Sequence, residues 1–170
     1  MAILRFINDL DSLMLSIAGG SSDALAELYN ETSAGVYAYA LSILKNSHDA
    51  EDVLQECYIR VFQSAAAYKP QGKPMAWILT IARNLCFKLL EQKKNVSLLS
   101  FDPGSQGWDP DDKLVVDACL KHLSDEERQI VILHAVAGMK HRQIAEFLSI
   151  PLSTVLSKYN RSIKKMRSYI

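Results

Sequence analysis

Apolar residues recur along this chain with the spacing of amphipathic α-helices, and no stretch alternates as a β-strand does. The clearest stripe lies over residues 49–63, where the spacing i, i+1, i+4, i+5, i+8 places apolar positions on one side of a helix. Its members are Val53, Leu54, Cys57, Tyr58, Val61 and Phe62, and Ala65 continues it just beyond residue 63. Similar patterns predict helices over about 22–43 and 75–94. Ser22 is the expected N-cap of the helix over 22–43, and Ser47 that of the helix over 49–63.

The helical pattern stops after Asn95, in a polar and acidic stretch that Pro103, Gly104, Gly107 and Pro110 interrupt. Such a composition is typical of a linker. Four further helices are predicted beyond it, over about 111–122, 124–136, 140–148 and 153–168. The S-x-x-E run that begins at Ser124 has the form of a capping box. The chain is therefore predicted to be all-α, with two small helical domains at 1–95 and 112–170 joined by a flexible acidic linker at 96–111.

The composition excludes several classes of protein. With 170 residues, 49% hydrophobic and 22% charged, and only 7 Gly and 5 Pro, the chain is neither collagen-like nor largely disordered. It has no apolar run near the roughly 20 residues that span a bilayer, and its start lacks the basic region of a signal peptide. Its 3 cysteines show no metal-ligand spacing, so neither a metal site nor a cofactor is expected. The prediction is a cytoplasmic protein without direct membrane insertion.

The net charge of zero conceals a strong alternation along the chain. Residues 1–68 carry −6 and residues 69–95 carry +5, whereas residues 96–117 carry −4 and residues 118–170 carry +5. Two basic blocks, each beside an acidic segment, indicate two surfaces that bind a polyanion such as nucleic acid. Chance clustering of charged residues is the simpler alternative.

The last two predicted helices have the pattern of a helix-turn-helix. Ile144, Phe147 and Leu148 form the expected inner face of the first helix, and Val155 and Tyr159 that of the second. The outer face of the second helix carries Ser153, Thr154, Ser157, Lys158, Arg161, Lys164 and Lys165. In this motif the second helix reads base edges while basic residues hold phosphates. The alternative is an ordinary helical hairpin with a solvated basic face.

Two other helices carry candidate binding surfaces. Opposite the apolar stripe of 49–63 lie Asp52, Gln55, Glu56, Ile59 and Gln63, which suit docking on a basic protein surface. The helix over 75–94 combines Trp77 with Arg83, Asn84, Lys88, Lys93 and Lys94, after a loop with Tyr68, Lys69 and Lys73. Aromatic rings interleaved with cations suit unstacked bases and their phosphates. A solvated acidic face and a buried core tryptophan are the structural alternatives.

Catalytic interpretations are weak. His48, Asp52 and Cys57 could form a nucleophile set, but Cys57 lies on the apolar stripe and is expected in the core. There is no glycine loop to cradle phosphates, and His134 and His141 have no ligand partner at helical spacing. The chain is therefore predicted not to be an enzyme.

Three segments, taken in order, resemble bacterial extracytoplasmic-function (ECF) sigma factors. Asp49 to Glu56 (DAEDVLQE) is similar to their polymerase-clamp-binding helix, and Ala76 to Asn84 (AWILTIARN) to their promoter-melting helix. Gln143 to Glu146 (QIAE), with Ile150-Pro151, Thr154-Val155 and Ser157-Lys158, is similar to their helix-turn-helix. The resemblance extends from about Leu13 to Met166.

The resemblance implies a factor that binds core RNA polymerase and directs it to promoter DNA, with an anti-sigma factor as a further partner. The polymerase-binding residues would be Asp49, Asp52, Gln55, Glu56 and Ile59. The minus-ten element would be contacted by Lys73, Trp77, Arg83, Asn84 and Lys88, with Asn84 at a flipped base. The minus-thirty-five element would be contacted by Ser153, Thr154, Ser157, Lys158, Arg161 and Lys164.

The sequence departs from the family pattern at Met75, Lys88, Glu91, Ser153 and Leu156. These departures bear on which promoter sequence is recognised and how tightly DNA is bound, more than on family membership. The extension Met1 to Ser12 has no interpretable counterpart, and the sequence names neither promoter nor inducing signal. Two rival functions stay open. One is a helix-turn-helix regulator that never engages polymerase, and the other is a sigma-like decoy that does not initiate transcription.

Overall fold

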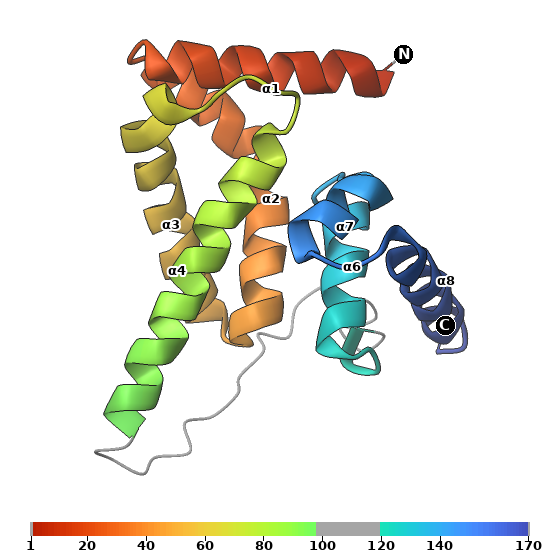
Figure 1. Ribbon diagram of the computed structural model, residues 1–170. Helices are drawn as coiled ribbons and strands as arrows, with labels where there is room; N and C mark the ends of the chain where they lie inside the picture. Colours follow the sequence, from red (N-terminus) through yellow and green to blue (C-terminus); the bar gives the residue numbers. More distant parts are fainter. Residues whose placement is uncertain (1, 98–119, 170) are drawn as a thin grey trace.

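A computed structural model describes residues 2–97 and 120–169, and all regular structure in these two ranges is helical (Figure 1). The helices are α1 (Ala2–Ala18), α2 (Ser22–Leu44), α3 (Ser47–Ser64), the 3₁₀ turn η1 (Ala65–Ala67), α4 (Pro74–Ser97), α6 (Asp125–Ala135), α7 (His141–Leu148) and α8 (Leu152–Arg167). The prediction of an all-α fold is confirmed. The predicted linker at 96–111 and the start of the second domain lie almost wholly outside the described residues.

Side-chain caps fix the starts of α2, α3 and α6. Ser124 and Glu127 form the predicted capping box at the start of α6. The other two predicted caps were wrong by one residue: the Ser21 hydroxyl accepts from the amide of Ala24, and the Asn46 side chain accepts from that of Asp49. A cap must stand outside the helix with extended backbone, and Ser22 and Ser47 already lie inside α2 and α3.

The N-terminal helices form a bundle in which α2, α3 and α4 stand side by side and α1 lies across one end (Figure 1). The predicted stripe of α3 faces this bundle, with Val53, Cys57, Tyr58 and Val61 buried. Phe62 is an exception, because it lies at the edge of the stripe and remains 42% exposed. Burial also raises the pKa of the Cys57 thiol to about 12, as expected for a core cysteine.

Helix α1 contains nearly all of the N-terminal extension, which had no interpretable counterpart in the family pattern. Leu10, Met14 and Ile17 recur at helical spacing and are buried against the rest of the bundle. The next helix follows after Gly20, whose φ of +91° allows a tight turn. The extension is thus part of the folded core from at least Leu10 onward.

The C-terminal helices α6, α7 and α8 form a second unit, which packs against α2 and α4 (Figure 1). Buried residues of both units, among them Val36 and Tyr39 on one side and Ile144 and Phe147 on the other, belong to one continuous apolar core. Gly35 allows the close approach, since a Cβ placed there would lie 2.9 Å from Cα of Ala137. The two units therefore form an extensive interface, which the sequence pattern did not predict.

Candidate protein and nucleic-acid interfaces

The solvent side of α3 presents most of the predicted polymerase-binding residues. Asp52 and Glu56 have side chains 63% and 46% exposed, and Gln55 and Ile59 are exposed beside them. Asp49 lies apart from this face, because its carboxylate pairs with Lys93 of α4 and is only 14% exposed. The acidic face therefore consists of Asp52, Gln55, Glu56 and Ile59, with Asp49 serving the contact between α3 and α4.

An apolar groove of about 380 Å³ adjoins this acidic face. It is lined by Leu25, Tyr29, Gln55, Tyr58, Ile59, Phe62 and Gln63, from α2 and α3. Its floor is fixed, since the Tyr58 ring meets Tyr29 edge-on and its hydroxyl lies 2.6 Å from that of Thr32. Exposed apolar side chains rimmed by acids and amides suit a protein partner with apolar and basic groups.

Three of the five predicted minus-ten residues, Lys73, Trp77 and Arg83, line a second cavity of about 540 Å³ between the loop at 68–73 and α4. Trp77 is half-buried, with its ring edge-on to that of Tyr68 at a centroid distance of 5.4 Å. Lys69, Lys73 and Arg83 supply cations to the cavity wall. Asn84 and Lys88 are exposed further along α4. Cations and an accessible aromatic ring thus occur together, as single-stranded nucleic acid requires.

Helix α7 closes the far side of this cavity. The Arg83 guanidinium lies 4.6 Å from the centroid of the Phe147 ring, and its Nη1 donates to the Phe147 carbonyl at 3.0 Å. Lys73 pairs with Glu146 at 2.6 Å, which lowers the pKa of that carboxyl. Two of the five predicted minus-ten residues are therefore engaged by the helix-turn-helix itself.

Phe147 was predicted to lie on the inner face of the helix-turn-helix, and it is buried instead against the N-terminal unit. Its ring meets that of Tyr39 edge-on at 5.6 Å, in addition to the contact with Arg83. Burial of Tyr39 raises the pKa of its hydroxyl to about 12, although Arg83 acts in the opposite direction. Ile144 and Val155 are fully buried, as the helix-turn-helix pattern predicted.

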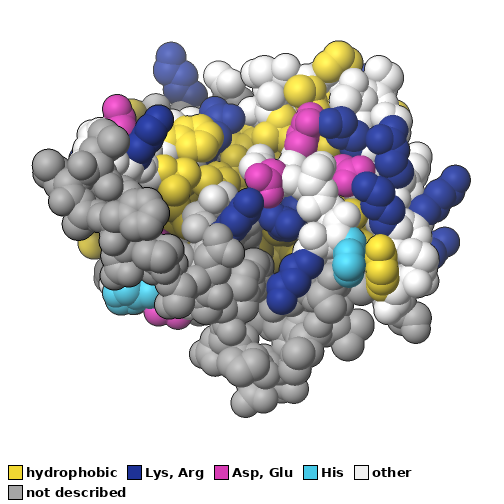
Figure 2. Space-filling model, turned by 90° about the horizontal axis from the view of Figure 1, so that it is seen from below, with side chains coloured by type: hydrophobic (Ala, Val, Ile, Leu, Met, Phe, Trp, Pro, Cys, Tyr) yellow, Lys and Arg dark blue, Asp and Glu magenta, His cyan; other side chains and the backbone are white. Residues whose placement is uncertain are grey.

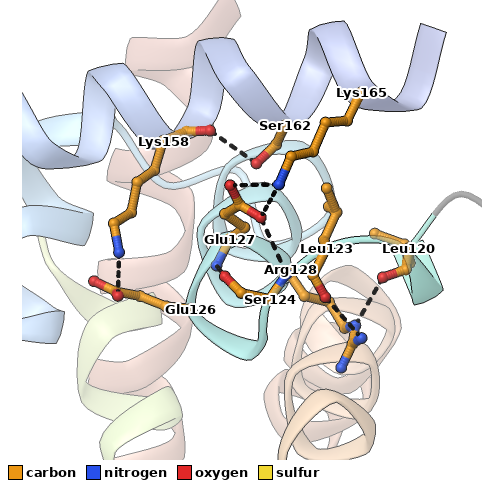
Figure 3. Close-up of polar contacts among 9 residues, drawn as sticks. All are labelled: Leu120, Leu123, Ser124, Glu126, Glu127, Arg128, Lys158, Ser162 and Lys165. Carbon is orange, nitrogen blue, oxygen red and sulfur yellow. Dashed lines mark hydrogen bonds and ion pairs between the residues drawn. The ribbon is translucent and has the colours of Figure 1, made fainter. Parts of the chain in front are cut away.

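Helix α8 is anchored to α6 by its lysines (Figure 3). Lys158 pairs with Glu126, while Lys165 pairs with Glu127 at 2.9 Å and lowers the pKa of that carboxyl. Both lysines thus turn toward α6 and are only partly exposed. Ser153, Ser157, Arg161 and Lys164 are exposed on the same helix, and Thr154 is half-buried. On the face of the molecule that Figure 2 shows from below, many Lys and Arg side chains lie together, interspersed with acids.

A cluster of rings lies inside the helix-turn-helix unit. The His134 and His141 rings stack at a centroid distance of 4.1 Å, and Tyr159 meets both edge-on. Nδ1 of His134 lies 2.8 Å from the carbonyl oxygen of Met139, whereas the buried Nε2 of His141 has no hydrogen-bond partner among the described residues. No sequence signal could have shown this pair, because the two histidines lie on different helices.

Most helices of the two units fall within matches to known protein families. Residues 28–96 match the model of sigma-70 region 2, and residues 113–166 match that of sigma-70 region 4. The ECF RNA polymerase sigma factor SigK of Mycobacterium sp. (strain KMS) is 30% identical, over 94% of this chain and 90% of its own length. This chain belongs to the ECF sigma factors. It is an alternative sigma factor that acts in transcription initiation, within a family whose members are generally not enzymes.

Other relatives agree with this assignment. SigK of Mycobacterium bovis (strain BCG / Pasteur 1173P2) is 27% identical over 96% of this chain and 95% of its own. Among solved structures, CnrH in complex with the cytosolic domain of CnrY has a TM-score of 0.67 at 19% identity, covering 94% of this chain and 96% of CnrH. RpoE of Bartonella quintana, in complex with the anti-sigma factor NepR, has the same TM-score and identity, over 88% and 97%. These two likenesses show the fold.

The family matches also locate the known regions on the helices. Region 2 covers all but the first turns of α2 and then α3 and α4, and region 4 covers α6, α7 and nearly all of α8. Helix α1 lies outside both matched regions. None of the described helices is long and apolar enough to cross a membrane.

Proposed function

We propose that this sigma factor binds core RNA polymerase through the acidic face of α3 and the groove beside it. The observation that supports this most directly is the exposure of Ile59, Phe62 and Tyr29 next to Asp52 and Glu56. Apolar side chains of this size are seldom left in water without a partner, and the flanking acids would select a basic one. Asp49 contributes indirectly, by holding α3 against α4 through Lys93.

Promoter recognition is divided between the two units in this proposal. The loop at 68–73 and α4 receive the single-stranded minus-ten element, through Lys73, Trp77, Arg83, Asn84 and Lys88. The exposed side of α8 enters the major groove of the minus-thirty-five element, through Ser153, Thr154, Ser157, Arg161 and Lys164. Lys158 joins them in this proposal by leaving its ion pair with Glu126. Polymerase performs the chemistry, so the sigma factor itself needs neither a catalytic residue nor a cofactor, and it works in the cytoplasm with polymerase.

The structure, in which α7 packs on α4, corresponds to a closed form of the factor, with the two units in contact across the minus-ten cavity. Arg83 and Lys73 cannot hold phosphates or bases while Phe147 and Glu146 occupy them. The two units must therefore separate before the minus-ten cavity can accept DNA, and polymerase binding would stabilise the open form. The sigma factor RpoE of Bartonella quintana is bound to the anti-sigma factor NepR, which supports an anti-sigma factor as a further partner of this chain.

The polymerase surface is tested with the double variant Asp52→Ala/Glu56→Ala. Asp52 pairs with His48 at 3.9 Å and Glu56 with Arg60 at 2.8 Å, and surface ion pairs of this kind stabilise a fold by about 0–1 kcal/mol. Thermal stability should therefore scarcely change, whereas affinity for core polymerase should fall by about tenfold or more. Asp23→Ala/Glu27→Ala is the matched control, since both acids are exposed on α2 at the same i, i+4 spacing. Equal polymerase affinity of the two double variants would contradict the assignment.

A further inference from the structure

Asp11 joins helix α1 to both ends of the loop that borders the minus-ten cavity. One carboxylate oxygen of Asp11 accepts from the Tyr68 hydroxyl, and the other accepts from the backbone amide of Gly72 at 3.0 Å. The partners are 57 and 61 residues away in sequence. Because α1 precedes the matched region 2, which begins at residue 28, Asp11 lies outside the segment that matches the family model, whereas Tyr68 and Gly72 lie inside it.

The contact determines the shape of a segment without regular structure. Between η1 and α4 the chain forms neither helix nor strand, so backbone hydrogen bonds of a regular element do not fix it. Gly72 turns the chain with φ of +68°, and its amide is held by Asp11 at that turn. A single carboxylate group, which can accept several hydrogen bonds, thereby closes a short loop at both of its ends.

Tyr68 transmits this constraint to the cavity. Its ring is buried, at 8% exposure, and meets Trp77 edge-on, while its hydroxyl reaches Asp11. Burial and the neighbouring Asp11 carboxylate both raise the pKa of the Tyr68 hydroxyl, so it stays a neutral donor at physiological pH. Lys69, Gln71 and Lys73 are left exposed on the outer side of the loop. The cations of the loop and the indole of α4 are thus held in one arrangement.

We infer that Asp11 is a positioning residue for promoter melting: through Tyr68 and Gly72 it holds the 68–73 loop in the shape that presents Lys69, Lys73 and Trp77 to single-stranded minus-ten DNA. The inference rests on the proposed role of this loop and α4. It assigns a function to α1, which contributes to promoter selectivity without touching DNA. Preorganisation of this kind reduces the ordering cost of binding.

The test compares holoenzymes formed with the wild type, Asp11→Asn and Tyr68→Phe on a library of duplex promoters with randomised minus-ten and minus-thirty-five positions. Asn matches Asp in size, but its amide nitrogen cannot accept from the second donor, and Phe keeps the ring contact with Trp77 while removing the hydroxyl. Each variant should lower transcript yield by about tenfold, as loss of a hydrogen bond to a charged group does, and should relax the base preference at minus ten. The minus-thirty-five preference should stay as in the wild type.

Two controls separate positioning from general damage. Glu27→Gln removes one charge from an exposed acid of α2 and should behave as the wild type does. The double variant Asp11→Asn/Tyr68→Phe should lose less than the product of the two single losses, because both changes break the same contact.

The outcomes distinguish this inference from the function on which it rests. Unchanged yield with unchanged minus-ten preference in Asp11→Asn would overturn the inference alone. An equal loss of yield on every promoter, without any change in minus-ten preference, would also overturn it and leave Asp11 a role in stability only. If the wild type itself selects no minus-ten sequence, that result contradicts the proposed function of the loop and therefore also the inference about Asp11.

Discussion

Gly35 offers a way to open the closed form without altering any residue assigned to DNA or polymerase. It lies on α2 where that helix meets the turn between α6 and α7, and a Cβ there would stand 2.9 Å from Cα and 3.1 Å from Cβ of Ala137. The nearest atom belongs to backbone and cannot swing aside. A third neighbour, the methyl of Met75 at 3.2 Å, ends a flexible side chain and can move. Gly35→Leu should therefore act as a wedge between the two units.

The expected magnitude follows from the cost of overpacking. Inserting methylenes into a well-packed interface costs about 1–3 kcal/mol. Leu also improves helix propensity over Gly by nearly 1 kcal/mol, but this gain is present in both the open and the closed form and cancels. The ratio of closed to open molecules should fall by roughly 5- to 150-fold, since 1.4 kcal/mol corresponds to a factor of ten.

The assay measures binding of a labelled, single-stranded minus-ten oligonucleotide to the isolated sigma factor by fluorescence anisotropy. Because only the open form can bind, the apparent affinity should rise with the open fraction, up to the limit at which most molecules are open. Small-angle scattering should show a radius of gyration above the roughly 16 Å expected for a compact chain of this length. Ala34→Leu is the matched control, since Ala34 is the adjacent residue of α2 and is exposed. Equal affinity and equal size for Gly35→Leu and Ala34→Leu would refute the reasoning.

Two further predictions concern the helix-turn-helix unit. Desolvation and the neighbouring His134 lower the pKa of His141 in the folded state. The free energy of unfolding is therefore highest above the unfolded pKa of about 6.5, and it falls as the pH drops below that value. His141→Phe should flatten this fall between pH 7 and 5, and an unchanged slope would contradict the prediction. Arg161→Ala and Lys164→Ala should weaken duplex binding on all sequences and lower the salt slope by about one phosphate contact each, whereas Ser157→Ala should change the preferred minus-thirty-five sequence. Binding titrations at several salt concentrations check the second prediction, and equal losses on every sequence for all three variants would show that the recognition surface is misplaced.

The sequence allowed prediction of features that depend on neighbours along the chain. The stripe of α3 was visible because Val53, Cys57 and Val61 repeat at helical spacing, and the capping box of α6 because Ser124 and Glu127 lie three residues apart. Most of the acidic face followed from the stripe, as the residues opposite to it. Asp49 could not be separated from that face, since its partner Lys93 is on another helix.

What the sequence could not show are contacts between distant segments. Periodicity marks Phe147 as buried but does not say whether α8 or the N-terminal unit buries it. Nothing local links Asp11 to Tyr68, because neither the α1 pattern nor the 68–73 loop pattern contains the other. The close approach at Gly35 could not be predicted for the same reason. The role of a glycine inside a helical pattern can be assigned only when the backbone that packs against it is known.

In vitro transcription with purified core polymerase on a library of random promoters tests the central assignment most directly. The account predicts that core polymerase with this sigma factor yields transcripts whose templates share one minus-ten and one minus-thirty-five motif at fixed spacing, and that core polymerase alone yields none of these. Binding of the factor to core polymerase without any enriched promoter would identify a decoy. Absence of both binding and enriched transcripts would contradict the assignment as a sigma factor that initiates transcription.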